Sequence, residues 1–238
     1  MMQAFILAGG LGTRLRAALP DWPKPLAPVA GRPFITHLLC WLRQQDINRV
    51  TLCLGYQAQA VIDTLGGGAG LGLRLSYSVE AEPLGTGGAL KLASRDSTGP
   101  ALVLNGDTFF DFELAGLLAT HQSTSAWVTL ALKREASGLA RGCAQLAEDG
   151  RIRAFAEKPE TAREALISAG VYVFDPEAFA HFPVQATFSL EREYFPGLAA
   201  TGRLAGHVAE GYFVDIGTPA AWQQFERDLL EGRVHDCA

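Results

Sequence analysis

A short apolar run near the start of the chain ends in a glycine-rich segment, and this feature constrains the fold more than any other. Residues 4–8 are continuously apolar and are followed at once by Gly9 and Gly10, which predicts a buried strand that ends in a loop. Because Gly12 adds a third position without a side chain, several backbone N–H groups can point at one spot. Such a loop suits an anion, and Arg14 follows it directly.

Two cations near this loop indicate that the anion is a phosphate. Arg14 can hold phosphate oxygens through two parallel hydrogen bonds, and Lys24 stands between two prolines that stiffen its backbone. The P-loop motif fails because Thr13 and Arg14 stand where it needs Lys and then Ser or Thr. The dinucleotide fingerprint fails because Leu15 replaces its third glycine. The loop therefore has another phosphate-binding design, and a plain tight turn stays open as the simpler interpretation.

Composition is that of an ordinary globular protein. The 238 residues are 48% hydrophobic and 19% charged, which predicts one domain spanning residues 1–238. The net charge of −5 and the lack of a basic run argue against a nucleic-acid partner. The apolar start is too short for a signal core or a membrane span. We expect a cytoplasmic protein that binds neither nucleic acid nor a membrane; a homo-oligomer stays open.

The cysteines and histidines add no metal or redox motif. Neither residue type shows the spacing of a zinc site or a redox pair. Reduced thiols are the simplest expectation for the four cysteines, which are Cys40, Cys53, Cys143 and Cys237.

Helices and strands alternate in the first half of the chain. Apolar periodicity predicts strands at 49–54, 73–79 and 101–104, and helices from Pro33 to about 42, at 57–65, at 89–94 and at 113–122. This order favours a mostly parallel sheet covered by helices on both faces. Asp107 follows the 101–104 strand, and the carboxyl end of such a strand is where open α/β sheets bind ligands.

The alternation stops in the second half. Residues 143–146 and 151–156 predict a hairpin with Asp149-Gly150 in its turn, between strands at 126–133 and 167–174. We expect this part to form a smaller sheet layer and the second wall of a cleft. A helix at 190–200, strands at 204–209 and 212–214, and a closing helix from 219 to about 232 complete the pattern.

Six separately spaced motifs resemble those of the sugar-1-phosphate nucleotidyltransferases, also called nucleotide-sugar pyrophosphorylases. They occupy residues 9–15 with 23–25, 82–88, 105–107, 157–159, 169–172 and 214–219, and the likeness runs from Phe5 to about Trp222. Pro-Leu-Gly-Thr-Gly-Gly and Asn-Gly-Asp-Thr-Phe-Phe are most similar to the guanylyltransferases that act on D-glycero-α-D-manno-heptose 1-phosphate.

The resemblance implies a fold and a reaction. The fold is an α/β, Rossmann-like three-layer sandwich with a mostly parallel mixed sheet and a smaller sugar-binding sheet layer, the nucleotide-diphospho-sugar transferase fold. Residues 1–125 would mainly bind the nucleotide, and residues 126–238 would mainly bind the sugar. The reaction is attack by a sugar 1-phosphate oxygen on the α-phosphorus of a nucleoside triphosphate, GTP being favoured, with release of pyrophosphate. The expected partners are these small-molecule substrates, and the product would serve cell-surface polysaccharide synthesis.

The resemblance also implies the catalytic residues. Asp107 and Asp215 would hold Mg²⁺ between them, since this ion takes carboxylate and phosphate oxygens. Arg14 would grip the leaving pyrophosphate, Lys24 would neutralise the α-phosphate, and Lys158 would hold the phosphate of the sugar. A solvated surface charge stays open for each lysine.

Nucleotide binding is expected from the glycine-rich loop and from an acidic reader of the base. Glu80 precedes the stretch that resembles the base-binding loop, and its carboxylate can accept from both N1–H and the N2 amine of guanine. Glu82 is the second candidate, and a solvated acidic turn is the third interpretation. The other expected nucleotide-binding residues are Leu7, Ala8, Gly9, Gly10, Gly12, Thr13, Pro83, Gly85, Thr86 and Asn105.

Sugar binding is expected from Gly142, Glu157, Ser168 and Gly170. The Glu157 carboxylate can accept from two hydroxyls. These enzymes usually have Asn two places before the glycine of Ala-Gly-Val-Tyr, where this chain has Ser168. Serine is shorter and has no amide, so one direct sugar contact is either missing or carried by water, and the identity of the sugar stays open.

Other functions fit parts of the sequence. A mannose-1-phosphate guanylyltransferase, or an N-acetylmuramate- or glucose-1-phosphate uridylyltransferase, would use the same motifs. A dinucleotide-dependent oxidoreductase would share the α/β pattern, but Leu15 counts against it. A non-catalytic nucleotide-sugar-binding regulatory protein would have little reason to retain all five expected catalytic residues.

Overall fold

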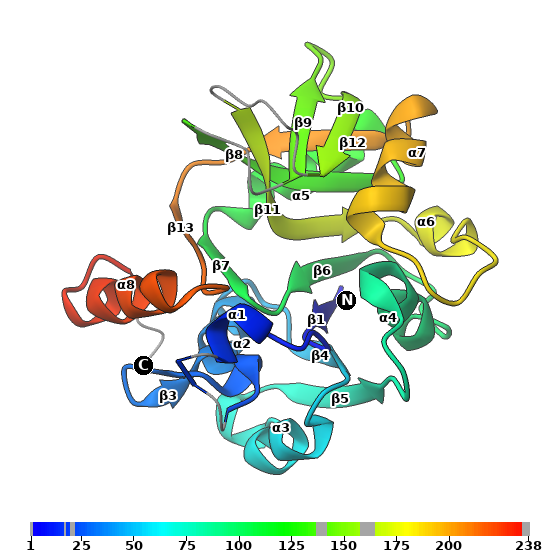
Figure 1. The fold of residues 1–238 in the computed structure, drawn as a ribbon. Helices are drawn as coiled ribbons and strands as arrows, with labels where there is room; N and C mark the ends of the chain where they lie inside the picture. The colour runs from blue at the N-terminus through cyan, green and yellow to red at the C-terminus, as the bar shows by residue number, and fades with distance from the viewer. Residues whose placement is uncertain (1, 17, 20–21, 137–141, 158–164, 235–238) are drawn as a thin grey trace. The chain divides into compact units, whose positions relative to one another are not determined.

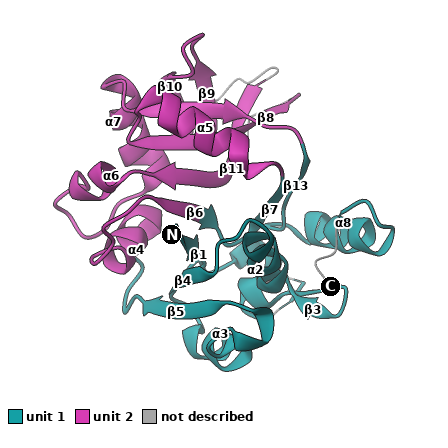
Figure 2. Ribbon diagram, turned by 180° about the vertical axis from the view of Figure 1, so that it is seen from behind, with its two compact units in different colours: residues 1–83, 104–111, 211–238 teal, residues 84–103, 112–210 magenta. Residues whose placement is uncertain are grey.

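The computed structural model describes residues 2–16, 18–19, 22–136, 142–157 and 165–234. The chain forms two compact units, each built from segments far apart in the sequence (Figure 2). Unit 1 contains residues 1–83, 104–111 and 211–238, and unit 2 contains residues 84–103 and 112–210. The expected halves, 1–125 and 126–238, were defined by the substrate that each would bind, and they stay a prediction.

Unit 1 contains a parallel sheet at the position where the sequence predicts one. Strand β1 (Gln3–Leu7) pairs with β4 (Arg49–Leu54), and β4 pairs with β5 (Arg74–Val79), all in parallel. Parallel strands need long crossovers, and the helices α2 (Phe34–Gln44) and α3 (Ala58–Leu65) lie in the connections (Figure 1). The expected strand–helix–strand order is confirmed here.

Helix α2 is buried almost all round. Every residue from Phe34 to Leu42 is buried, including Thr36 and His37, so this helix packs on more than its apolar face. Pro33 was expected as the first helical residue, but it is the N-cap of α2, and the Thr36 hydroxyl donates to its carbonyl at 2.6 Å. The helix begins one residue later than expected because Pro33 also pairs with Pro28 in a small hairpin.

A two-stranded antiparallel ladder in unit 1 was only half predicted. It joins β7 (Thr108–Asp111) to β13 (Tyr212–Asp215), and the sequence analysis predicts only the second of these strands. Helix α8 (Pro219–Leu230) packs against the ladder through Phe225, whose ring lies 5.2 Å from that of Phe109 and 6.1 Å from that of Tyr212. Unit 1 also contains short elements: α1 (Thr13–Arg16), η1 (Lys24–Leu26), β2 (Pro28–Val29), β3 (Arg32–Pro33) and η2 (Ala69–Leu71).

Asp228 fastens α8 to this ladder. Its carboxylate, 5% exposed, accepts from the Tyr212 hydroxyl at 2.5 Å, from Gln224 at 2.7 Å and from Arg233. Burial by itself raises the pKa of the Asp228 carboxyl, but the hydrogen bonds from Tyr212, Arg233 and Gln224 outweigh it and hold this pKa below its ordinary value. Burial is the largest cause of the raised pKa of the Tyr212 phenol, and the contact with Asp228 raises this pKa further.

The strands of unit 2 are mostly antiparallel. They follow the order β10 (Ile152–Glu157), β9 (Gly142–Leu146), β11 (Ala165–Phe174), β8 (Val128–Glu135) and β12 (Leu204–Val208). Strand β12 runs parallel to β8. The expected hairpin between β9 and β10 is confirmed, with Gly150 at φ +80° in its turn. Strand β6 (Ala101–Asn105) belongs to both units, since residues 101–103 lie in unit 2 and 104–105 in unit 1.

One helix of unit 2 begins earlier than expected. Helix α4 (Gly85–Ala93) includes Gly87 and Gly88, which the sequence analysis places before the helix. The carbonyl of Phe188 accepts the Gly87 N–H at 3.0 Å, and the Phe188 ring fills the space that a Cβ at Gly87 would need. These glycines are therefore required by packing and do not interrupt the helix. The other helical elements of unit 2 are α5 (Leu114–Thr124), α6 (Pro176–Ala180), the π-helix η3 (Leu190–Tyr194) and α7 (Phe195–Ala200).

In the described part of the chain, no helix combines the length and the apolar character needed to cross a bilayer.

We predict that Asp228→Asn lowers stability at neutral pH by about 1–3 kcal/mol, because a buried carboxylate loses hydrogen bonds from three donors. The folded-state pKa lies below the unfolded value, so this contribution is complete above the unfolded pKa and is lost as pH falls through the folded pKa. Thermal unfolding from pH 7 to pH 3 measures it.

The control is Asp63→Asn, since Asp63 accepts from Gln59 in the same i,i+4 arrangement as Asp228 and Gln224 but is exposed. Asp63→Asn should change stability little. A stability difference for Asp228→Asn that widened toward acid pH would contradict the prediction.

Candidate active site

The glycine-rich loop leads from β1 into α1 in unit 1. Leu7 and Ala8 close the strand, and Ala8 donates its N–H to the carbonyl of Cys53 at 2.8 Å. Gly12 lies at φ +57°, a left-handed conformation that favours glycine, and a Cβ there would stand 3.0 Å from Cβ of Lys24. Gly10 has open space around it, because a Cβ there would meet nothing within 4 Å. The loop therefore leaves its backbone accessible, as a phosphate site requires.

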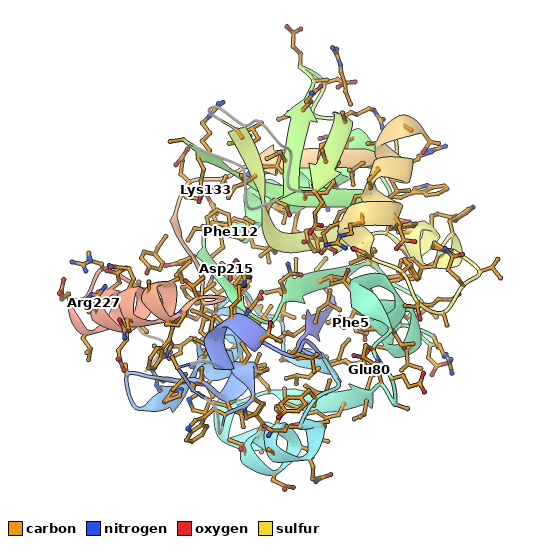
Figure 3. All side chains as sticks on the ribbon, in the orientation of Figure 1. Phe5, Glu80, Phe112, Lys133, Asp215 and Arg227 are labelled. Atoms are coloured by element: carbon orange, nitrogen blue, oxygen red, sulfur yellow. The ribbon has the colours of Figure 1, made fainter. Side chains whose placement is uncertain are left out.

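Glu80 reaches this loop from the end of β5. Its backbone N–H donates to the carbonyl of Leu54 at 2.9 Å, and a Cβ on Gly9 would lie only 2.8 Å from Oε1 of Glu80. A Cβ on Gly55 would lie equally close to the same oxygen, at 2.7 Å. Figure 3 labels Glu80 and, at the end of β13, Asp215. Of the two candidate base readers, Glu80 therefore lies against the loop, whereas Glu82 is exposed.

The Glu80 carboxylate also affects a buried thiol. Burial, with the negative charge of Glu80 added, raises the pKa of Cys53 to about 12. Cys53 stays a protonated thiol at neutral pH, and both Cys53 and the buried Cys40 are free thiols. Cys237 lies outside the described residues.

Lys24 and Asp107 form the central ion pair of the site. The Lys24 ammonium lies 2.5 Å from Oδ2 of Asp107, with the lysine side chain 13% exposed and the aspartate 37%. The interpretation of Lys24 as a solvated surface charge is therefore wrong. Asp107 follows Gly106, whose N–H donates to the carbonyl of Leu7 at 2.8 Å and whose Cβ, if present, would lie 2.8 Å from Ala8. That contact places Asp107 beside the start of the glycine-rich loop.

Asp215 is brought to Asp107 by the ladder between β7 and β13. Asp215 pairs with Thr108, the residue after Asp107, and the N–H of Ile216 donates to the Asp107 carbonyl at 2.9 Å. The Asp215 carboxylate is oriented by the N–H of Gly217, which donates to Oδ1 at 2.8 Å. Two aspartates that are remote in the sequence thus lie at the same end of the ladder.

Gly217 marks the point where the charged groups converge. A Cβ at this position would lie 2.9 Å from Oδ1 of Asp215, 3.0 Å from Nη2 of Arg14 and 3.5 Å from Nζ of Lys24. A side chain here would crowd the Asp215 carboxylate and the Arg14 guanidinium, whereas Lys24 would be at ordinary contact distance. The sequence analysis did not assign Gly217 to the site, although its place inside the Val-Asp-Ile-Gly-Thr-Pro motif was a usable signal.

The carboxylate pair suits Mg²⁺ only as part of a mixed ligand set. Among the residues that the structure describes, no group of three or more His, Cys, Asp or Glu could hold a metal ion. Mg²⁺ is commonly bound by one or two carboxylates with water and substrate phosphate oxygens, and the pair Asp107 and Asp215 fits this pattern. The remaining ligands would come from the nucleotide and from solvent.

Other expected nucleotide-binding residues lie on elements already described. Thr13 begins α1, Asn105 ends β6, and Pro83 is the last residue of the 1–83 segment of unit 1. Gly85 and Thr86 form the first turn of α4 in unit 2, where a Cβ on Gly85 would stand 2.6 Å from the carbonyl oxygen of Phe188.

The expected sugar-binding residues gather in unit 2. Glu157, the last residue of β10, pairs directly with Gly142, the first residue of β9, and a Cβ on Gly142 would meet the Phe155 ring. The Glu157 carboxylate lies 3.9 Å from Nε of Arg192, a residue that the sequence analysis did not single out. Lys158, the next residue after Glu157, lies outside the described residues.

Ser168 and Gly170 lie on the adjacent strand, β11. The pairing of β11 with β8 shifts register between Ser168 and Tyr172, and Gly170 stands inside this irregularity at φ +70°. The Ser168 hydroxyl donates to the Tyr172 hydroxyl at a long 3.4 Å. Since β9 lies between β10 and β11, these four residues occupy three neighbouring strands. The β-bulge turns the backbone at the position where the family pattern has Asn.

A model of the nucleotidyl transferase family matches residues 3–232 of this chain. This chain belongs to that family. The expected membership of the sugar-1-phosphate nucleotidyltransferases is thereby confirmed. In this nucleotidyl transferase, unit 1 contains the glycine-rich loop. The same unit contains the two cations, Arg14 and Lys24, and the two carboxylates, Asp107 and Asp215.

Similar proteins agree with this assignment. The mannose-1-phosphate guanylyltransferase of Mycobacterium tuberculosis is 39% identical over 97% of this chain, which spans 65% of that protein's length. The D-glycero-alpha-D-manno-heptose 1-phosphate guanylyltransferase of Aneurinibacillus thermoaerophilus is 36% identical, with 96% of this chain and 98% of the relative covered. The crystal structure of HddC from Yersinia pseudotuberculosis complexed with GMP-PN is 29% identical, with a TM-score of 0.83 and 96% and 100% of the two chains covered. The expected fold class is confirmed by this structural similarity.

We predict that Gly217→Ala folds normally but loses about 10- to 100-fold in turnover, since its methyl group would displace catalytic groups by a fraction of an ångström or more. Gly197→Ala in α7 is the control, because a Cβ there meets nothing within 4 Å. Pyrophosphate release and thermal unfolding measure the two properties. Turnover of Gly217→Ala equal to that of the control would show that the convergence at Gly217 does not matter.

Proposed function

We propose that this nucleotidyl transferase joins GTP to a sugar 1-phosphate, D-glycero-α-D-manno-heptose 1-phosphate being favoured, to give a GDP-sugar and pyrophosphate. The observation that carries the proposal is the convergence of Arg14, Lys24 and Asp215 on Gly217, with Asp107 paired to Lys24. The named activities of the similar proteins support the choice of guanine, and one of them, with the motif resemblance, supports the heptose.

The chemistry requires charge compensation more than a general base. The second pKa of a phosphate monoester is about 6, so the attacking oxygen of the sugar phosphate is already anionic at neutral pH. Two anionic reactants must then be held in line while the charge of the transition state is spread. Arg14 would hold the leaving pyrophosphate, and Lys24 would bind the α-phosphate from its place beside Asp107. Lys158 would bind the phosphate of the sugar.

Asp107 and Asp215 would hold Mg²⁺, which when bound supplies Lewis-acid stabilisation to phosphate oxygens. The Gly217 N–H keeps the Asp215 carboxylate aimed, and the ladder keeps the two aspartates adjacent. The protein's own part is thus to fix the two carboxylates before the substrates arrive.

The first experiment offers the purified protein each of four nucleoside triphosphates with Mg²⁺ and a panel of sugar 1-phosphates, and follows pyrophosphate release. GTP with the heptose 1-phosphate should give the highest kcat/KM. Mannose 1-phosphate is the second candidate because of the relative from Mycobacterium tuberculosis. A preference for UTP or dTTP would overturn the proposal, and a preference for mannose 1-phosphate would correct only the sugar. The product would serve cell-surface polysaccharide synthesis.

We predict that Asp107→Asn and Asp215→Asn each reduce turnover by about 100-fold or more, since each removes a carboxylate from the place where the transition state gathers charge. The loss should be accompanied by weaker Mg²⁺ dependence in a titration of the metal. The control is Asp111→Asn at the far end of β7, which should leave turnover intact. An Asp215→Asn enzyme with normal turnover at limiting Mg²⁺ would remove Asp215 from the site.

We predict that Glu80→Gln lowers kcat/KM for GTP by about 10- to 100-fold, because a hydrogen bond to a charged group contributes about 1.5–3 kcal/mol. The lead of GTP over other nucleotides should narrow. Glu82→Gln is the matched variant, since Glu82 is exposed and Glu80 lies against Gly9. A change of base preference in Glu82→Gln alone would make Glu82 the reader instead.

A further inference from the structure

The π-helix η3 lies between two parts of unit 2 that are expected to bind different substrates. It contacts α4, whose first turn contains Gly85 and Thr86 of the expected base-binding loop. It also contacts β10, which ends at the expected sugar-binding residue Glu157. π-Helical turns are rare and frequent at functional sites. Its place in unit 2 allows η3 to connect the two substrate-binding regions.

On the side of α4, the Thr86 hydroxyl makes two hydrogen bonds to η3. It donates to Oε2 of Glu191 at 2.7 Å and accepts the N–H of Leu190 at 2.9 Å. A threonine hydroxyl has one proton, and here that proton is committed to Glu191. Glu191 Oε2 also accepts from the Ser189 hydroxyl at 3.0 Å. The Glu191 carboxylate therefore joins the first turn of α4 to the beginning of η3.

On the side of β10, the next residue of the π-helix contacts the sugar-binding carboxylate. Nε of Arg192 lies 3.9 Å from Oε1 of Glu157, with Arg192 67% and Glu157 21% exposed. An ion pair this exposed adds little to stability, so a role for it lies in where it places the Arg192 guanidinium relative to the Glu157 carboxylate.

The backbone that carries Glu191 and Arg192 is held at both ends. At the start, the Ser189 hydroxyl accepts the Arg192 N–H at 3.2 Å. At the end, the Phe195 ring packs edge-on against Phe155 of β10 at 5.6 Å. Because both ends of this backbone are held, we expect a displacement of Glu191 to move Arg192 as well.

We propose that Glu191 and Arg192 are positioning residues that link the base-binding loop to the sugar-binding carboxylate: Glu191 holds Thr86, and Arg192 orients Glu157. The inference rests on the proposed function, because it takes the roles of Thr86 and Glu157 from there. It assigns the Thr86 hydroxyl to this link and leaves nucleotide contact to the backbone of the loop. Coupling of this kind is reciprocal, so the two substrates should affect each other's binding through it.

The test compares Thr86→Val, which removes the hydroxyl, with Thr86→Ser, which keeps it. KM for the sugar 1-phosphate should rise about 5- to 50-fold in Thr86→Val, and by more than KM for GTP, while Thr86→Ser restores it. Adding Thr86→Val to Arg192→Gln should raise this KM no further, because residues that act through one link are not additive.

A matched pair on η3 separates the link from general damage to the helix. Glu191→Ala removes the bridge to Thr86, whereas Glu193→Ala removes only a contact within the segment, in which the Glu193 carboxylate accepts the Ser189 N–H at 2.9 Å. Glu191→Ala should reproduce the effect of Thr86→Val, and Glu193→Ala should leave KM for the sugar 1-phosphate near the wild-type value.

Amide hydrogen exchange without substrate gives a readout that is independent of turnover. In Thr86→Val, the amides of residues 152–157 should exchange faster than in the wild type and in Thr86→Ser. Unchanged exchange there, or a rise in KM for GTP alone, would overturn the link. A wild-type protein that turns over no sugar 1-phosphate would instead count against the proposed function, while the exchange result would still decide the link.

Discussion

The antiparallel ladder between β7 and β13 is the interaction on which the candidate active site depends. It joins residues from the middle of the chain to residues near its end, and it places Asp215 beside Asp107. Helix α8 holds the ladder through the buried ring of Phe225 and through Asp228. Because closing so long a chain segment costs conformational entropy, this aromatic and hydrogen-bonded packing is what keeps the two carboxylates adjacent.

The charges of the site balance one another before a substrate binds. Lys24 is largely buried and needs a counter-charge, which Asp107 supplies at 2.5 Å. Taking such a pair out of water costs energy that its attraction only partly returns, so the pair is better explained by function than by stability. Arg14 and Asp215 also lie next to Gly217, which has no side chain to crowd them. A phosphate group would meet preorganised cations there, which is the main requirement of phosphoryl chemistry.

In unit 2, strand pairing and a β-bulge position the expected site residues, whereas in unit 1 the expected site residues are mainly charged groups in contact. Gly142 and Glu157 are cross-strand partners, and the bulge around Gly170 turns the neighbouring strand beside them. Arg192 of the π-helix lies near the Glu157 carboxylate, and Glu191 of the same helix accepts a hydrogen bond from Thr86 in the first turn of α4. The departure at Ser168 therefore occurs where several other contacts shape the region expected to bind the sugar.

The sequence by itself determined the elements whose cause is local. The apolar run of β1, the periodicity of α2 and the Asp149-Gly150 turn predicted those elements nearly to the residue, and the family motifs pointed to Arg14, Lys24 and Asp215, which meet around Gly217. Only the tertiary structure decided the rest. Strand β7 is too short to show a period and exists because β13 pairs with it, and Gly87 stays helical because Phe188 fills the space beside it. The role of Gly217 was decided in the same way. Whether a glycine matters to a site depends on which distant side chains surround it, and the local sequence does not contain that information.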